Sequence, residues 1–352
     1  MAKIVGGFGS SHSPLMSLKT GELWEIHAQN DPKNRELVKM PEGKRVTWDE
    51  LLATADPEIA KVVNREMFDQ RIEALQDGLD ELNKRFGETT PDVVVMFGDD
   101  QSEFFFDDNM PMINVYWGEE VQLVPRPVTP EMSEARRATA LAYGEDDRPY
   151  PCDRDLGLRI IEGLCEMDFD VSHTQYQKEA YGGTIGPATW YLDMDRTTKP
   201  RRFGLPHAFS FPIVRWFDGK DVPIVPITIN TCYPPNWIGP RRSYALGQAV
   251  RKIVEDWDSD KNVAFACSGG LSHFVVDEEL DRMALKGMEK ADAGILTSLP
   301  RHRLQSATTE TLNWVATAGA MGNTKMETIA YEPGYRTAAG TGCGCAVGHW
   351  HD

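Results

Sequence analysis

Residues 92–101 read Asp-Val-Val-Val-Met-Phe-Gly-Asp-Asp-Gln, and this stretch decides the fold class. Its short apolar run is rich in β-branched residues and is bounded by aspartate and glycine, which is typical of a buried strand. Strands of this kind belong to parallel sheets that helices cover on both faces. Ligands bind beyond the carboxyl ends of such strands, so we expect functional groups directly after Phe97.

Three other segments resemble this strand, and helical spacing fills much of the chain between them. The further predicted strands are Lys3 to Phe8, Pro223 to Ile229 and Asn262 to Cys267. The predicted helices are Glu66 to Arg85, Asp155 to Met167, Tyr244 to Trp257 and Thr308 to Ala318. Alternating strands and helices predict an α/β fold with a mostly parallel central sheet covered by helices.

The chain of 352 residues has an ordinary globular composition, and we interpret residues 1–352 as a single catalytic domain. Two stretches are interpreted as insertions, at about residues 18–57 and 181–202. Long connections of this kind act as lids or substrate-binding loops, or they simply decorate the surface. The sequence leaves both readings open.

The chain carries 54 acidic and 37 basic side chains, for a net charge of −17. This charge repels phosphate backbones and anionic membranes, so we expect neither nucleic acid nor a membrane as a partner. The first residues lack the pattern of a secretory signal, which predicts a cytoplasmic protein. Six cysteines are too few for a disulfide scaffold, and Cys343-Gly-Cys345 is interpreted as a structural segment of small residues.

Polar residues that follow the predicted strands are the candidates for chemistry. His12 and Glu279 are the first candidates for a metal site, because imidazole and carboxylate ligands are common in metal enzymes that activate oxygen or water. The alternatives are a hydrogen-bonded structural histidine and a solvated helix face. His207 lies in an apolar setting that favours a neutral imidazole able to accept a proton, or it is a buried structural histidine.

The run from Asn230 to Asn236 is typical of a turn, and two interpretations stay open: it presents Tyr233 or Asn230 to a ligand, or it is simply a rigid turn. Arg241 and Arg242 are candidates for holding a substrate carboxylate, with a surface role as the alternative. The chain has no nucleophile elbow, phosphate loop or dinucleotide-binding fingerprint, which disfavours hydride transfer and nucleotide hydrolysis.

Taken in order, six motifs resemble those of the class III extradiol ring-cleavage dioxygenases, including the catalytic beta subunit of protocatechuate 4,5-dioxygenase. The motifs are Gly-Ser-Ser-His12-Ser-Pro, residues 92–101, Pro206-His207-Ala-Phe-Ser-Phe-Pro, Asn230-Thr-Cys-Tyr-Pro-Pro, Ser268-Gly-Gly-Leu-Ser-His273 and Glu279-Leu-Asp281. Within the superfamily, the Gly-Asp-Asp-Gln version is similar to the branch that contains 3-O-methylgallate dioxygenases.

The resemblance implies a non-haem Fe(II) site in which His12 and Glu279 are ligands. Gln101 occupies the position of the family's second histidine ligand, and Asp100 is the alternative ligand there. A ligating Asp100 would add negative charge and favour a harder metal.

The remaining roles follow by position in the same motifs. His207 matches the acid/base histidine of the family. Ser13 matches a residue that contacts substrate, and His273 matches a histidine beside the site.

The function that the resemblance implies is ring cleavage, with O2, of a catecholic or gallate-type aromatic such as 3-O-methylgallate, gallate or a protocatechuate-like compound. One alternative is an altered-site member that performs hydrolase or lyase chemistry on a phenol through His207. Another is a metal-poor binding protein. We expect a homodimer, in which the insertion at 18–57 or a second copy of the chain closes the site.

Overall fold

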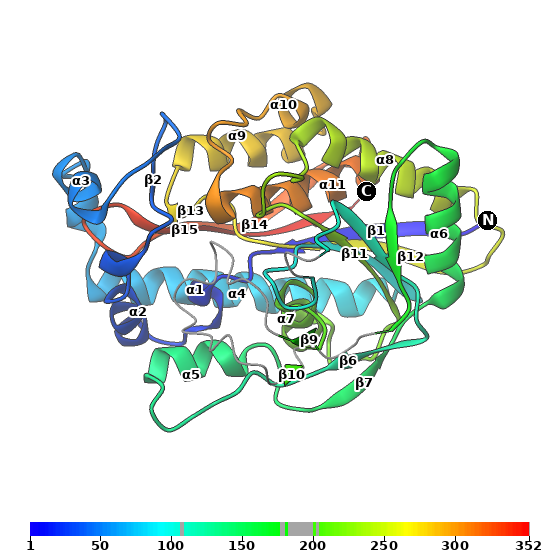
Figure 1. Cartoon of the computed structure of the whole chain (residues 1–352), viewed down its shortest axis with the longest axis horizontal. Helices are drawn as coiled ribbons and strands as arrows, with labels where there is room; N and C mark the ends of the chain where they lie inside the picture. The colour runs from blue at the N-terminus through cyan, green and yellow to red at the C-terminus, as the bar shows by residue number, and fades with distance from the viewer. Residues whose placement is uncertain (106–108, 177–179, 182–199, 202–203, 352) are drawn as a thin grey trace.

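A computed structural model of the protein describes residues 1–105, 109–176, 180–181, 200–201 and 204–351. Four parallel strands form the centre of its main sheet, in the order β1 (Lys3–Ser10), β12 (Asn262–Ser268), β4 (Val93–Gly98) and β11 (Ile224–Ile229). These are the four strands that the sequence predicts, each with slightly different ends. The predicted α/β class with a mostly parallel centre is confirmed (Figure 1).

Five further strands extend this centre on both sides, and the two that pair directly with it are antiparallel to it, so that the described residues form a nine-stranded mixed sheet. The added strands are β15 (Thr341–Trp350), β14 (Met326–Tyr335) and β13 (His273–Val275) on one side, and β5 (Ile113–Tyr116) and β8 (Ser172–Thr174) on the other. β15 pairs with β1, while β13 and β14 both pair with β15. The segment Cys343-Gly-Cys345 lies inside buried β15, as its structural interpretation expects.

Helices cover both faces of the sheet, and alternate residues of β4 point into the two cores that result. One face carries α6 (Arg154–Glu166), α8 (Pro240–Glu255), α9 (Glu278–Glu289), α10 (Ala293–Thr297) and α11 (Thr311–Met321). The other carries α1 (Pro14–Ser17), α2 (Gly21–Ala28), α4 (Arg65–Thr89), α5 (Glu134–Leu141) and α7 (His207–Trp216). Figure 1 shows the two layers above and below the sheet. Within the described part of the chain, no helix is both long and apolar enough to span a bilayer.

The predicted insertion at 18–57 forms α2, a β2–β3 hairpin (Val38–Lys39 and Lys44–Arg45) and α3 (Trp48–Ala53). It packs at the β13 edge of the sheet through a small core that includes Leu37 and Val275. The second predicted insertion, at 181–202, falls largely outside the described residues. Only the pairing of β9 (Ala180–Tyr181) with β10 (Pro200–Arg201) is described there. The single domain over 1–352 stays a prediction.

Short elements complete the chain. They are the hairpin of β6 (Glu120–Leu123) and β7 (Arg148–Pro151), and the 3-10 helices η1 (Asp31–Lys33), η2 (Ile59–Val62) and η4 (Ser306–Glu310). η4 leads directly into α11. Because α11 packs on the strands beside the carboxyl ends of β12 and β4, the end of η4 comes to lie over the edge of the sheet where the site is found.

Candidate functional site

Three neighbouring parallel strands end at one edge of the sheet, and each delivers polar residues there. β1 leads into Ser11 and His12, β4 leads into Asp99, and β12 ends at Ser268. Because β12 pairs in parallel with both β1 and β4, these residues are brought together although they are far apart in the sequence. The site therefore lies where the parallel topology predicts it.

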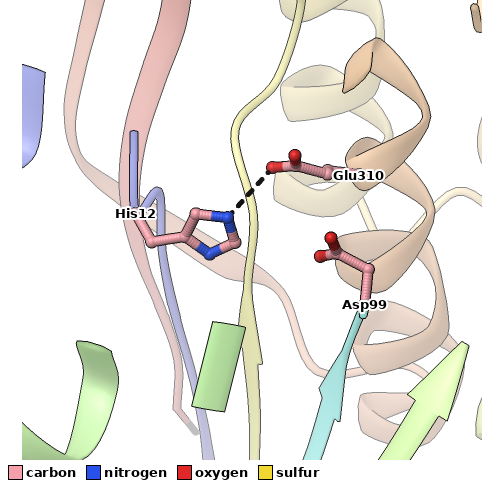
Figure 2. Close-up of side chains that lie close together, drawn as sticks. All are labelled: His12, Asp99 and Glu310. Atoms are coloured by element: carbon pink, nitrogen blue, oxygen red, sulfur yellow. Dashed lines mark ion pairs between the residues drawn. The ribbon is translucent and has the colours of Figure 1, made fainter. Parts of the chain in front are cut away.

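His12, Asp99 and Glu310 form a buried cluster at this edge. One possible ligand atom from each lies within 4.8 Å of the others, and all three side chains are buried. Figure 2 shows the three side chains turned toward one another. His12 Nε2 lies 3.3 Å from Glu310 Oε2. Among the described residues these three groups form the candidate metal centre.

The ring of His12 is oriented by its other nitrogen. Its Nδ1 forms a hydrogen bond of 2.7 Å with Ser268 Oγ, while Nε2 is buried and has no hydrogen-bond partner among the described residues. Histidines that bind metals are held in this way, by a hydrogen bond to the nitrogen that is not the ligand. His12 therefore presents a free nitrogen to the two carboxylates.

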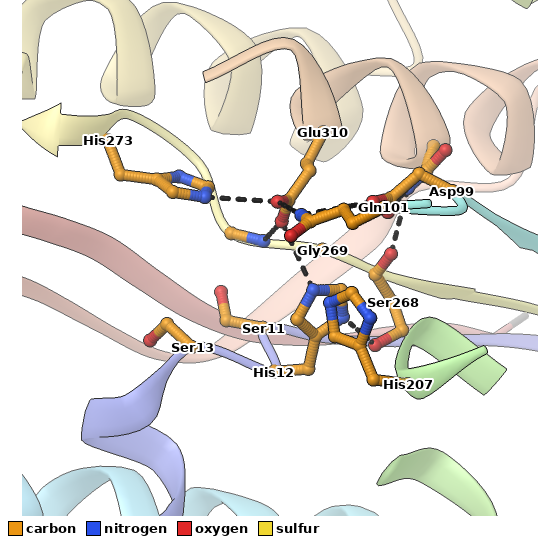
Figure 3. A network of polar contacts seen from close by, with 12 residues as sticks. Ser11, His12, Ser13, Asp99, Gln101, His207, Ser268, Gly269, His273 and Glu310 are labelled. Carbon is orange, nitrogen blue, oxygen red and sulfur yellow. Dashed lines mark hydrogen bonds and ion pairs between the residues drawn. The ribbon is translucent and has the colours of Figure 1, made fainter. Parts of the chain in front are cut away.

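Glu310 is held by three hydrogen-bond donors around its carboxylate. Its Oε1 accepts hydrogen bonds from Gln101 Nε2 (2.8 Å) and His273 Nε2 (3.1 Å), and its Oε2 accepts one from the backbone N–H of Gly270 (2.7 Å). Figure 3 shows this network. Burial alone would raise the pKa of Glu310, but the charge on His273 and the contact with His12 hold it well below its usual value. Glu310 is therefore an ionised carboxylate.

Asp99 is the second carboxylate of the cluster. It accepts hydrogen bonds from Asn313 Nδ2 (2.9 Å) and Gln101 Nε2 (3.3 Å). Burial, followed by the negative charge of Glu310, raises the pKa of Asp99. Two carboxylates that share a buried space repel each other, and a cation between them removes the repulsion.

His273 supports Glu310 from behind. Its Nδ1 lies 3.0 Å from the carbonyl oxygen of Leu271 and its Nε2 lies 3.1 Å from Glu310 Oε1, so both nitrogens face acceptors. Burial lowers the pKa of His273, but the charge of Glu310 outweighs burial and raises it well above its usual value. Both observations indicate an imidazolium that donates from both nitrogens.

His207 stands on the other side of His12. It is the first residue of α7, and its ring meets the ring of His12 edge-on with centroids 4.4 Å apart. Burial is the main cause that lowers the pKa of His207 to about 3, and His12 adds to the effect. At neutral pH His207 is therefore an uncharged imidazole beside the cluster.

Other predicted site residues lie elsewhere or have other partners. Glu279 does not reach His12: its side chain is 72% exposed and forms an ion pair of 3.2 Å with Arg303. The carboxylate that faces His12 is Glu310. Two adjacent acidic residues in the first turn of α9 are stabilised by the helix dipole without burial, which accounts for the exposed position.

Asp100 turns away from the cluster into its own loop. Its carboxylate accepts the backbone N–H groups of Glu103, Phe104 and Phe105. Gln101 does lie beside the cluster, but its amide nitrogen faces the carboxylates, which makes it a hydrogen-bond donor to Asp99 and Glu310 in this arrangement. Of the adjacent aspartates, Asp99 is the one that joins the candidate metal centre.

The residues proposed to contact substrate are placed as follows. Ser13 is buried with its hydroxyl 3.0 Å from Cys345 Sγ, and His273 contacts Glu310. Asn230 uses both ends of its amide inside the turn, through the N–H and the carbonyl of Tyr233. The Tyr233 hydroxyl is buried without a partner among the described residues.

Arg241 and Arg242 are exposed at the start of α8, as the surface reading expects.

Asp99, Glu310 and Glu103, whose Oε2 lies 2.7 Å from His207 Nδ1, are the site residues that the motifs did not single out. A signal for Glu310 was present, because it is the only charged residue between Arg303 and Lys325. A lone charge within a long uncharged stretch has to find a partner when the stretch is buried. A signal for Asp99 was its place directly after a predicted strand.

Three comparisons place this chain among known proteins. A search of the curated proteins finds no match. Among solved structures, that of an uncharacterized protein from Escherichia coli K12 is similar at 12% identity and a TM-score of 0.38, covering 77% of this chain and 91% of that one. A family model described as the catalytic LigB subunit of aromatic ring-opening dioxygenase matches residues 57–344, a range that includes Asp99, His207 and Glu310 and begins after His12. This match covers most of the chain, which therefore belongs to the LigB family of aromatic ring-opening dioxygenases.

Proposed function

We propose that this protein is an Fe(II)-dependent extradiol dioxygenase that opens the ring of a catecholic or gallate-type aromatic with O2. The observation that carries the proposal is the buried cluster of His12, Asp99 and Glu310 with the neutral imidazole of His207 beside it. Family membership supports the reaction class. Gallate, 3-O-methylgallate and protocatechuate are the substrates to test first.

The donor set fits a divalent metal. His12 offers a buried nitrogen with no hydrogen-bond partner among the described residues, and Asp99 and Glu310 offer carboxylate oxygens close to it. His273 as imidazolium offsets one of the two negative charges, so a divalent ion leaves the centre with only a small net charge. When bound, Fe(II) supplies the redox chemistry that joins an aromatic diol to O2.

His207 is the residue we assign to proton transfer. A neutral imidazole in a buried site accepts a proton from a phenolic O–H, leaving a phenolate and an imidazolium. The same imidazolium can return the proton later in the reaction. Burial of the site keeps water from competing for these protons.

The test is oxygen uptake by Fe(II)-reconstituted protein with gallate, 3-O-methylgallate, protocatechuate and catechol, together with absorbance of the ring-opened product. We expect stoichiometric uptake with one of these compounds. His207→Ala should lower the rate of ring opening by about 100-fold or more, while the protein still binds metal. No uptake from iron-loaded protein with any of the four compounds would contradict the proposal.

A second candidate function is hydrolase or lyase chemistry on a phenol. The donor set of the candidate metal centre is the observation that favours it. Two carboxylates and one imidazole form a harder site than the two histidines and one carboxylate common in Fe(II) oxygenases. Turnover of a phenolic ester in the absence of O2, lost in His207→Ala, would support this candidate over ring opening.

A further inference from the structure

Glu103 lies in the loop that follows β4, and one of its carboxylate oxygens holds His207 at two points. Glu103 Oε2 lies 2.7 Å from His207 Nδ1 and accepts the backbone N–H of the same residue at 3.1 Å. His207 is the first residue of α7, where backbone N–H groups have no partner within the helix. The contact therefore fixes both the start of the helix and the plane of the ring.

The position of Glu103 is itself built by its neighbours. The Asp100 carboxylate accepts the backbone N–H groups of Glu103, Phe104 and Phe105, which folds the loop around it. Arg126 forms an ion pair with the other carboxylate oxygen of Glu103. The side chain of Glu103 is buried, and both of its oxygens have partners.

A carboxylate at Nδ1 selects one tautomer of a neutral imidazole. Nδ1 must carry the proton in order to donate to Glu103, which leaves Nε2 with a lone pair. In the opposite tautomer, two lone pairs would meet at 2.7 Å. The negative charge also stabilises the imidazolium that forms when Nε2 accepts a proton.

We propose that Glu103 is a positioning residue for His207, which holds the ring as the Nδ1–H tautomer so that Nε2 is the proton acceptor of the reaction. Asp100 supports Glu103 by shaping the loop. This role differs from the metal-ligand role that the position of Asp100 in the sequence suggested. The role of Nε2 as proton acceptor rests on the proposed function. The tautomer of His207 does not depend on that function.

The direct test is ¹⁵N NMR of the full chain labelled at histidine and loaded with diamagnetic Zn²⁺. The His207 resonances are identified by their loss in His207→Gln. We expect a protonated Nδ1 and an unprotonated Nε2 at neutral pH in the unchanged protein. In Glu103→Ala we expect a mixture of tautomers, and in Glu103→Gln we expect the original tautomer, because the amide oxygen still accepts from Nδ1.

Kinetics and metal binding complete the test. With the substrate found in the uptake assay, Glu103→Ala should lower kcat by about 100-fold with little change in KM, because it removes the orientation of the base. The kcat of Glu103→Gln should lie between those of Glu103→Ala and the unchanged protein. The metal affinity of both variants should stay within about twofold of that of the unchanged protein. Glu119→Ala is the matched control, since Glu119 is 79% exposed and pairs with Arg154 away from the site; it should change none of these values.

The outcomes separate this inference from the proposed function. A protonated Nε2 in the unchanged protein, or an unaltered tautomer in Glu103→Ala, would overturn the assignment of Glu103. The expected tautomers together with no oxygen uptake on any substrate would overturn ring opening and leave the Glu103–His207 pair intact.

Discussion

The carboxylate of Glu310 is surrounded by groups from four different parts of the chain: Gln101, His273 and the Gly270 backbone donate hydrogen bonds to it, and His12 Nε2 lies 3.3 Å away across the gap. These contacts fix its two oxygens before any metal binds, so that little rearrangement is needed for coordination. A neutral amide at this position is a weaker ligand and cannot balance the charge of His273.

We therefore expect Glu310→Gln to weaken divalent metal binding by about 100-fold or more, an effect at least as large as the loss of an outer partner of a metal ligand. Competition with a chromophoric chelator measures the affinity. Glu279→Gln is the matched control, because the exposed Glu279 carboxylate is paired with Arg303. Equal affinities in the two variants would remove Glu310 from the metal site.

Sequence patterns predicted the neighbourhood of the site better than its members. Strand ends predicted that polar residues following different strands meet, and the residues after β1 and β4 do lie at one edge because these strands run parallel. They could not decide between Asp99 and Asp100, since successive side chains point in opposite directions and the loop then decides which one faces the site. The choice between Glu279 and Glu310 depends on tertiary packing, which spacing along the chain does not contain.

The packing of α8 against α11 shows how an element positions the site. Gly247 of α8 and Gly319 of α11 lie at the crossing, where a Cβ on Gly319 would come 2.2 Å from the carbonyl oxygen of Tyr244. Backbone atoms cannot move out of the way as a side chain can. The two helices are thus held close together, and α11 begins directly after Glu310 and carries Asn313, which contacts Asp99.

We expect Gly319→Ala to destabilise the protein by about 3 kcal/mol, because overpacking outweighs the better helix propensity of alanine. It should also weaken metal binding, since α11 has to shift. Gly87→Ala in α4 is the control: the atoms nearest to its Cβ would be those of the Asp218 side chain, the closest at 2.8 Å, and this side chain can turn away. Urea unfolding of both variants tests the prediction, and an unchanged stability in Gly319→Ala would contradict it.

Among the elements, the buried central strands were the most predictable. The C-terminal hairpin, formed by β14 and β15, was the least predictable. The four central strands are apolar runs that remain buried whatever surrounds them. β15 reads Thr-Gly-Cys-Gly-Cys-Ala-Val-Gly-His-Trp, and its glycines disfavour a strand by local propensity. They are present because other groups approach closely: a Cβ on Gly344 would lie 1.9 Å from Asp281 Oδ2. This is a tertiary requirement that local sequence does not express.

At the scale of the whole molecule, a buried ion pair joins the segment at 18–57 to the C-terminal hairpin. Asp31 Oδ2 accepts a hydrogen bond of 2.8 Å from Arg336 Nε and another from the Thr341 hydroxyl, and both charged side chains are buried. Arg336→Met should cost about 3–5 kcal/mol in unfolding free energy, because it leaves the Asp31 charge buried without its partner. The double variant with Asp31→Asn should recover a large part of that loss, and thermal unfolding of the three proteins measures it. Equal losses in the single and double variants would contradict this account.

The response of the whole fold to acid is set in part by His349 on β15. Its ring is buried and stacks on Phe8 with centroids 4.7 Å apart. Burial, followed by the charges of His351 and Arg85, lowers the pKa of His349 to about 4. The unfolded chain takes up this proton near its ordinary pKa of about 6.5, so between these two values the unfolded state binds more protons than the folded state. Stability must therefore fall as the pH is lowered through this window.

We expect His349→Phe, which keeps an aromatic ring against Phe8 and removes the titrating group, to lessen this fall. Between pH 7.5 and pH 5.0 the contribution of His349 amounts to about 2 kcal/mol, so the variant should lose about 2 kcal/mol less unfolding free energy over that range than the unchanged protein. Urea unfolding at the two pH values measures the difference. Because the comparison is made within each protein, any change in packing caused by the larger ring cancels. If both proteins lost the same stability, His349 would have to be protonated in the folded state already, and the buried stack on Phe8 would have to accept a charge without cost.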